Sequence, residues 1–207
     1  MKQLRGFYAI TDEKLIAENI FTETVEQALL GGARIIQYRD KSSDTKKRLS
    51  QASALKIICD QHNAVLIIND DIELALEVDA DGVHIGIHDM PLTQARKKIG
   101  HKKIIGVSCY NKFELAEQAV TEGADYIAFG SFFSSQIKPH AAQATPDLLI
   151  KAKQQFDIPV CSIGGITSDN ANLLIESGAD MVAIISDIYS SDNVLAASQR
   201  ISQLFEK

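Results

Sequence analysis

The sequence predicts an α/β protein, a single (β/α)8 TIM barrel over residues 1–207. Short apolar segments rich in valine, isoleucine and aromatic residues recur along the chain, each too short for a buried helix. Amphipathic segments of helical period lie between them, and no Pro-, Gly- or Ser-rich linker divides the chain. Strand followed by helix, eight times over, favours a closed parallel barrel near the lower size limit. A doubly wound open sheet is the alternative.

The expected strands cover, in order, residues 7–11, 34–38, 64–69, 82–86, 103–108, 125–130, 159–165 and 180–186. Helices are expected over residues 24–33, 45–62, 112–124, 145–156 and 168–179, with another beginning near Ile72. Three of these helices run into the segments GGAR, EGAD and SGAD. Each segment places a glycine just past a helix end, where a left-handed cap normally leads into the next strand.

Composition limits the classes of partner. The formal net charge is −6 and the pI is about 5.4, so no broad basic surface indicates nucleic acid or an anionic membrane. No apolar run is long enough to span a membrane, and the first residues lack the apolar core of a signal peptide. The cysteines are odd in number and far apart, which favours reduced thiols in the cytoplasm: Cys59, Cys109 and Cys161.

The segment IIQYRDK, residues 35–41, starts as a buried strand and ends in polar side chains. Side chains alternate faces along a strand, so Gln37, Arg39 and Lys41 project to the same side. Any one charged strand end is more often a solvated turn. The column of an amide, a guanidinium and an ammonium nevertheless favours an anion-binding role at the barrel mouth, where such enzymes place their sites.

Carboxylates follow the next two strands. Asn69 and Asp70 end the segment AVLIIND, and Asp89 follows GVHIGIH. Asp70 or Asp71 could simply cap the following helix, and Asp89 could cap another. Two carboxylates at adjacent strand ends also match Mg²⁺, which proteins usually hold with one or two carboxylates plus substrate phosphate oxygens.

Later strand ends predict a phosphate site and a functional loop. Gly164 and Gly165 end the seventh strand, and Ile185 and Ser186 end the eighth, where barrels often bind phosphate. The loop after the sixth strand is long enough to be a lid or binding loop, and it carries Ser135, Gln136, Ile137 and Lys138. His84 lies inside a strand and is expected to be a satisfied interior histidine, whereas His88 and His140 in mouth loops remain acid–base candidates.

The ordered series YAITD, QYRDK, NDD, DGVHIG, IIGVS, FGSFFSSQIKP, IGGI and VAIIS resembles the thiamine-phosphate synthase family along nearly the whole chain. The resemblance implies that an aminopyrimidine methyl diphosphate loses pyrophosphate through a carbocation-like transition state and is attacked by the nitrogen of a thiazole phosphate. It implies Mg²⁺ at Asp70 and Asp89, with catalytic roles for Arg39, Lys41 and Lys138.

Further site residues carry over by position. The pyrimidine diphosphate would contact Gln37, Arg39, Lys41, Asn69, Ser108 and Lys138. The thiazole phosphate would contact Ser135, Gln136, Ile137, Gly165, Ile185 and Ser186. Ile87 replaces a frequent glutamine of the family, and Ile137 replaces a threonine.

Other functions stay open at this point. A thiazole tautomerase would need no metal and could use His88 as a base. A non-catalytic barrel that binds thiazole phosphate or thiamine phosphate would have little need for both carboxylates. A sugar-phosphate isomerase would share the glycine pair but not the metal pair. The sequence also leaves a homo-oligomer open.

Overall fold

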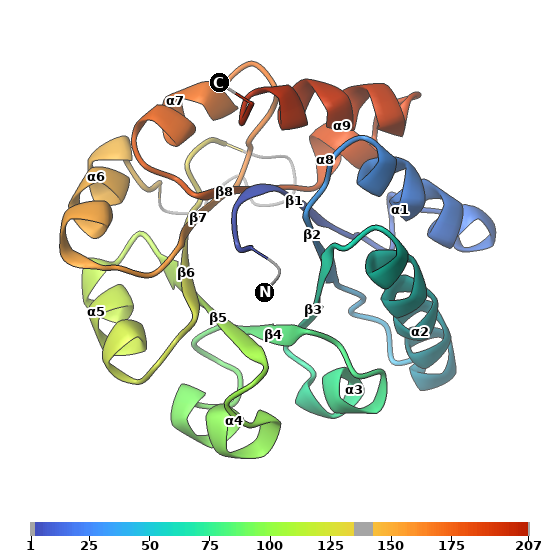
Figure 1. Cartoon of the computed structure of the whole chain (residues 1–207), viewed down its shortest axis with the longest axis horizontal. Helices are drawn as coiled ribbons and strands as arrows, with labels where there is room; N and C mark the ends of the chain where they lie inside the picture. Colours follow the sequence, from blue (N-terminus) through green and yellow to red (C-terminus); the bar gives the residue numbers. More distant parts are fainter. Residues whose placement is uncertain (1–2, 135–142, 207) are drawn as a thin grey trace.

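The computed structural model describes residues 3–134 and 143–206, and within them eight parallel strands close into a barrel surrounded by helices (Figure 1). The strands are β1 (Gly6–Ile10), β2 (Ile35–Tyr38), β3 (Val65–Asn69), β4 (Gly82–Ile85), β5 (Ile104–Tyr110), β6 (Tyr126–Gly130), β7 (Val160–Ile163) and β8 (Met181–Ile184). β1 pairs with both β2 and β8, so the closed barrel is confirmed and the open-sheet alternative is wrong.

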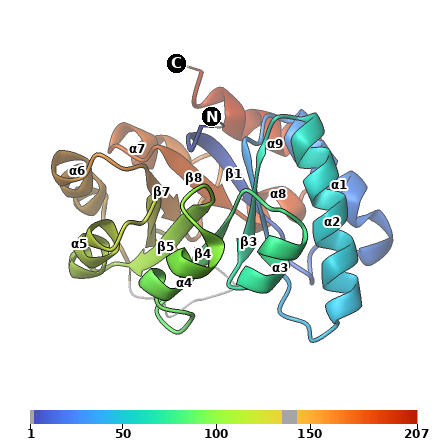
Figure 2. The ribbon, with the colours of Figure 1, turned by 60° about the horizontal axis from the view of Figure 1, so that its bottom comes forward.

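The helices follow the strands and form an outer ring (Figure 1). They are α1 (Phe21–Leu30), α2 (Thr45–Gln61), α3 (Ile72–Glu77), α4 (Leu92–Ile99), α5 (Phe113–Thr121), α6 (Pro146–Gln155), α7 (Ala171–Glu176), α8 (Ser186–Tyr189) and α9 (Val194–Gln203), with a short 3₁₀ helix at Glu18–Ile20. The three expected left-handed caps are present at Gly32, Gly123 and Gly178, with φ of 101°, 91° and 105°. Figure 2 shows the ring from the side, with α1, α2 and α9 along one flank of the barrel.

Side-chain alternation divides the core into two layers. Outward-facing strand residues such as Ile36 and Tyr38 pack with the helices, and the ring of Tyr38 meets Phe21 of α1 edge to face at 5.9 Å between centroids. A smaller cluster fills the barrel interior: Tyr8, Ile10, Ile35, Val65, Ile67, Tyr126, Ala128, Cys161, Met181 and Ala183. This interior layer forms the floor on which the polar strand ends stand.

Candidate active site

A cavity of about 690 Å³ opens at the carboxyl ends of the strands. Its walls include the predicted site residues Gln37, Arg39, Asn69, Ser108, Gly165, Ile185 and Ser186. The barrel therefore brings together, at one mouth, residues from β2, β3, β5, β7 and β8 that lie far apart in the sequence. Lys41, Asp70 and Asp89 do not line the cavity.

Of the column predicted on β2, Gln37 and Arg39 line the cavity and Lys41 does not, and the three side chains meet different partners. Gln37 is buried and its Nε2 donates to the hydroxyl of Tyr8 at 2.6 Å. The guanidinium of Arg39 lies 3.8 Å from the carboxylates of Asp12 and Glu13 in the loop after β1. Lys41 reaches β3 instead. Arg39 therefore stands in the cavity wall with its charge only loosely balanced, which suits an anionic ligand.

The structure separates the neighbouring carboxylates Asp70 and Asp71. Asp71 is the N-cap of α3, because its Oδ1 accepts from the backbone N–H of Leu74 at 3.0 Å. Asp70 adopts a left-handed backbone conformation with φ of 63°, and its Oδ2 lies 2.5 Å from Nζ of Lys41. Helix capping thus accounts for Asp71 and leaves Asp70 at the mouth.

Asp89 does not cap a helix either. The N-cap of α4 is Pro91, whereas Oδ2 of Asp89 accepts from the backbone N–H of Gly86 at 2.7 Å within the same loop. Burial raises the pKa of Asp89, and the nearby carboxylate of Asp70 raises it further. The two acidic groups therefore lie close enough to repel each other, which a divalent cation would relieve.

This pair fits the prediction of Mg²⁺ at Asp70 and Asp89. No group of three or more His, Cys, Asp or Glu side chains in the described part of the chain could enclose a metal. With one or two carboxylates as protein ligands, Mg²⁺ usually keeps several waters and takes up substrate phosphate oxygens, so the metal assignment stays a prediction for this pair.

The other side of the cavity is built from backbone. Gly164 and Gly165 have φ of 102° and 65°. A Cβ on Gly165 would lie 2.6 Å from the carbonyl oxygen of Phe133, so only glycine fits there. Ser186 begins α8, one residue after the end of β8. At Gly164 and Gly165, which line the cavity, no side chain would keep a ligand away from the backbone of the predicted phosphate corner.

Sequence reasoning missed a chain of hydrogen bonds at the floor of the cavity, in which every member except Tyr126 lines the cavity. The hydroxyls of Tyr8 and Tyr126 lie 2.9 Å apart, Nδ1 of His84 lies 2.9 Å from the Tyr126 hydroxyl, and Nε2 of His84 lies 2.8 Å from Oγ of Ser108. Together with the bond from Gln37, four links join β2, β1, β6, β4 and β5. His84 is thus an interior histidine with both nitrogens bonded, and burial lowers its pKa to about 4.

The remaining predicted site residues either line the cavity or lie outside the residues that the structure describes. His88 and Ile87 line the cavity, and the side chain of Ile87 is exposed. The predicted site residues Ser135, Gln136, Ile137 and Lys138, and the acid–base candidate His140, lie outside the described residues. Their roles stay predictions.

Comparison with known proteins gives consistent matches. The sequence model of the family described as thiamine monophosphate synthase matches residues 7–188. A thiamine-phosphate synthase from Thioalkalivibrio sulfidiphilus is 44% identical over 205 residues, covering 99% of this chain and 97% of the relative. One from Acidithiobacillus ferrooxidans is also 44% identical over 205 residues, covering 98% and 94%.

Solved structures agree. The thiamine phosphate pyrophosphorylase of Pyrococcus furiosus matches with a TM-score of 0.89 and 35% identity, covering 97% of this chain and 95% of that one. A geranylgeranylglyceryl phosphate synthase from Thermoplasma acidophilum shares the fold, with a TM-score of 0.75 and 19% identity. Across residues 3–134 and 143–206, no helix has the length and apolar character needed to cross a membrane.

Proposed function

This chain belongs to the thiamine monophosphate synthase family, and we propose that its barrel mouth joins an aminopyrimidine methyl diphosphate to a thiazole phosphate. It is a transferase of thiamine biosynthesis. The observation that carries the proposed chemistry is a cavity of about 690 Å³ that has an amide and a guanidinium on one wall and a glycine corner on the other.

Two chemically different walls suit two substrates. Gln37, Arg39, Asn69 and Ser108 supply polar contacts on the β2 to β5 side. Gly165, Ile185 and Ser186 supply amides and a hydroxyl on the β7 and β8 side. We assign the first wall to the pyrimidine diphosphate and the second to the phosphate of the thiazole, so that the thiazole nitrogen faces the pyrimidine methylene carbon.

The reaction breaks a C–O bond and leaves pyrophosphate. Negative charge grows on the departing group, and fixed cations beside it lower the barrier more than they strengthen ground-state binding. Arg39 and Lys41 follow the carboxyl end of β2, and we assign this role to them. We assign the same role to Lys138 from its sequence position. The electron-rich thiazole nitrogen then forms the C–N bond of thiamine phosphate.

We further propose that Asp70 and Asp89 hold Mg²⁺ when the diphosphate is bound. The ion would supply positive charge to the phosphate oxygens as the C–O bond weakens. The closeness of the two carboxylates and the raised pKa of Asp89 support this assignment. We also expect a cytoplasmic location, since the three cysteines are buried, odd in number and far apart in the sequence.

The test is an endpoint assay for thiamine phosphate and pyrophosphate, with both substrates present and with each omitted. We expect product only when both are present, loss of product on chelation, and recovery with added Mg²⁺. Arg39→Gln should lower kcat/KM for the pyrimidine diphosphate by roughly 100-fold, as expected for a lost charge at a developing anion. Arg34→Gln, on the opposite end of β2, is the matched control. Turnover of a thiazole substrate alone would instead indicate a tautomerase.

A further inference from the structure

The hydrogen-bonded residues at the floor of the cavity are closely packed. Tyr8 and Tyr126 have almost no exposed surface, and the imidazole of His84 stacks on the Tyr126 ring at 5.6 Å between centroids. A Cβ on Gly106 would lie 1.9 Å from the Tyr126 ring, so β5 carries glycine where that ring passes. We call the residues Gln37, Tyr8, Tyr126, His84 and Ser108 the relay.

The orientation of the Gln37 amide gives the hydrogen bonds of the relay one direction. Tyr8 accepts from Nε2 of Gln37, and its own proton has one acceptor among the described residues, the hydroxyl of Tyr126. Tyr126 must then donate to Nδ1 of His84. With Nε2 of Gln37 toward Tyr8, this arrangement gives the hydroxyl protons of Tyr8 and Tyr126 an acceptor each, and a buried proton without one is costly. Turning the Gln37 amide would reverse every donor and acceptor, so the orientation of that amide sets the direction.

The tautomer of His84 follows. Both ring nitrogens of His84 face hydroxyl groups, and Nδ1 accepts from Tyr126, so the ring carries one proton. With Nδ1 accepting, that proton is on Nε2 and is donated to Oγ of Ser108 at 2.8 Å. The hydroxyl proton of Ser108 is then free to be donated to a ligand in the cavity.

At the other end of the relay, the hydrogen bond to Tyr8 orients the amide of Gln37. Its Nε2 is committed to Tyr8, and no other described residue bonds its Oε1. Gln37 and Ser108 both line the cavity. The cavity therefore offers an acceptor at Gln37 and a donor at Ser108.

We propose that Tyr8, Tyr126 and His84 are positioning residues that make the cavity select an amino-substituted pyrimidine over its oxo analogue. An exocyclic amino group donates and an unprotonated ring nitrogen accepts, which matches Oε1 of Gln37 and the hydroxyl of Ser108. In the oxo form the substituent becomes an acceptor and the adjacent ring nitrogen carries a proton, so both contacts are mismatched. This inference rests on the proposed function, because that function supplies the pyrimidine diphosphate.

Tyr126→Phe is the decisive variant because it keeps the ring and removes the central hydroxyl. Tyr8 would then lack its acceptor, and Gln37 could turn its amide to accept from Tyr8 and present Nε2 to the cavity. His84 would no longer be held in one tautomer. Selectivity for the amino form should fall at both ends of the relay.

The experiment measures, by calorimetry with Mg²⁺, the affinities of the amino and oxo pyrimidine methyl diphosphates. The wild type should prefer the amino compound by roughly 100-fold or more, and Tyr126→Phe should reduce that preference at least about tenfold. Tyr189→Phe is the control, since Tyr189 is also buried but its hydroxyl has no described partner. If Tyr126→Phe does not fold, Tyr8→Phe should release Gln37 alone and reduce the preference by a smaller factor.

A nitrogen NMR spectrum of the wild type gives a readout without substrate. We expect the His84 tautomer with its proton on Nε2. A proton on Nδ1, equal binding of the two diphosphates by the wild type, or unchanged preference in Tyr126→Phe would each overturn the inference. Binding selectivity without turnover would contradict the proposed function and leave the relay standing.

Discussion

Nζ of Lys41 lies 2.5 Å from Oδ2 of Asp70, so a cation assigned to the diphosphate and a carboxylate assigned to Mg²⁺ neutralise each other across β2 and β3. The side chain of Lys41 is 53% exposed and that of Asp70 is 27% exposed, so the pair is weak and readily exchanged. Arrival of a diphosphate with its metal would give each group a partner of opposite charge. The ion pair therefore holds both side chains in place until a ligand that carries a negative diphosphate and a positive metal ion replaces it.

Removing the ammonium should free Asp70 for the metal. We expect Lys41→Met to lower the Kd for Mg²⁺, measured without substrate, by up to about fivefold, since an exposed pair contributes up to about 1 kcal/mol. The KM for the pyrimidine diphosphate should rise in the same variant. Lys112→Met removes another cation from the cavity wall, one that forms no ion pair with a described residue, and should change Mg²⁺ affinity less. Weaker Mg²⁺ binding in Lys41→Met would contradict the idea that Lys41 and Mg²⁺ compete for Asp70.

The adjacent carboxylates Asp70 and Asp71 offer a matched pair of substitutions. Asp70→Asn and Asp89→Asn should each lower turnover roughly 100-fold or more and raise the Mg²⁺ needed for half-maximal rate, because the metal supplies several kcal/mol of charge stabilisation. Asp71→Asn keeps a good N-cap and loses only the contact with Arg48 at 2.7 Å, so stability should change by about 1 kcal/mol or less. Wild-type rates at limiting Mg²⁺ in both site variants would sink the metal assignment.

The glycine caps and the pair Asp70 and Asp71 show which features the sequence could predict and which it could not. Periodicity was sufficient for the barrel, because strand and helix patterns are local and the caps at Gly32, Gly123 and Gly178 mark where one gives way to the next. The same pattern could not distinguish Asp70 from Asp71. That choice depends on the left-handed φ of 63° at Asp70, which only the turn after β3 sets.

The hydrogen bonds of the relay could not be predicted from the sequences of the single strands. Tyr8 and Tyr126 look like ordinary strand aromatics, and their contact at 2.9 Å depends on barrel closure across 118 residues of sequence. One local signal was available in Gly106, because a glycine inside an apolar strand often marks close approach of another group. The pairing partner still required the three-dimensional register.

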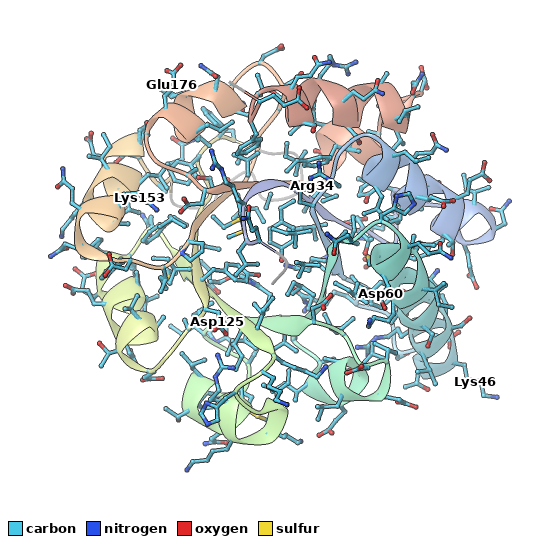
Figure 3. The ribbon with its side chains drawn as sticks, in the orientation of Figure 1. Arg34, Lys46, Asp60, Asp125, Lys153 and Glu176 are labelled. Carbon is cyan, nitrogen blue, oxygen red and sulfur yellow. The ribbon has the colours of Figure 1, made fainter. Side chains whose placement is uncertain are left out.

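The end of the barrel opposite the mouth contains a repeated stabilising contact. Asp81, Asp125 and Asp180 each precede a strand and accept from a backbone N–H of the strand before it, at 2.7 to 2.8 Å. Oδ2 of Asp125 also accepts from Arg96 at 2.5 Å, and Figure 3 shows Asp125 beside β5.

Asp125→Ala should therefore destabilise the fold without affecting the site. Loss of the acceptor leaves the N–H of Ile105 without its partner, and we expect a loss of about 1–3 kcal/mol in the free energy of unfolding. Asp125→Asn retains an acceptor oxygen and should lose less. Urea denaturation gives the stabilities, and kcat/KM should stay within about twofold of wild type in both variants. A large loss of activity in the folded variants would show coupling between the two ends of the barrel.

The low pKa of His84 predicts a loss of stability in mild acid. Burial lowers this pKa from 6.5 to about 4, so between these values the unfolded chain binds a proton that the folded chain excludes. Stability from this residue is therefore fully present above about pH 6.5 and is lost as pH falls toward 4. At pH 5 the loss amounts to about 2 kcal/mol relative to pH 7.5.

Denaturation curves at several pH values check this loss. The comparison is between wild type and a His84 variant, because carboxylates also change the free energy of unfolding with pH below pH 5. His84→Gln should be less stable than wild type at pH 7.5, through damage to the relay, yet lose about 2 kcal/mol less on acidification to pH 5. His101→Gln, at an exposed position, should follow the wild-type curve. Parallel curves for wild type and His84→Gln would mean that His84 binds a proton equally well in the folded and unfolded chains. The relay would then lack the neutral imidazole on which its direction depends.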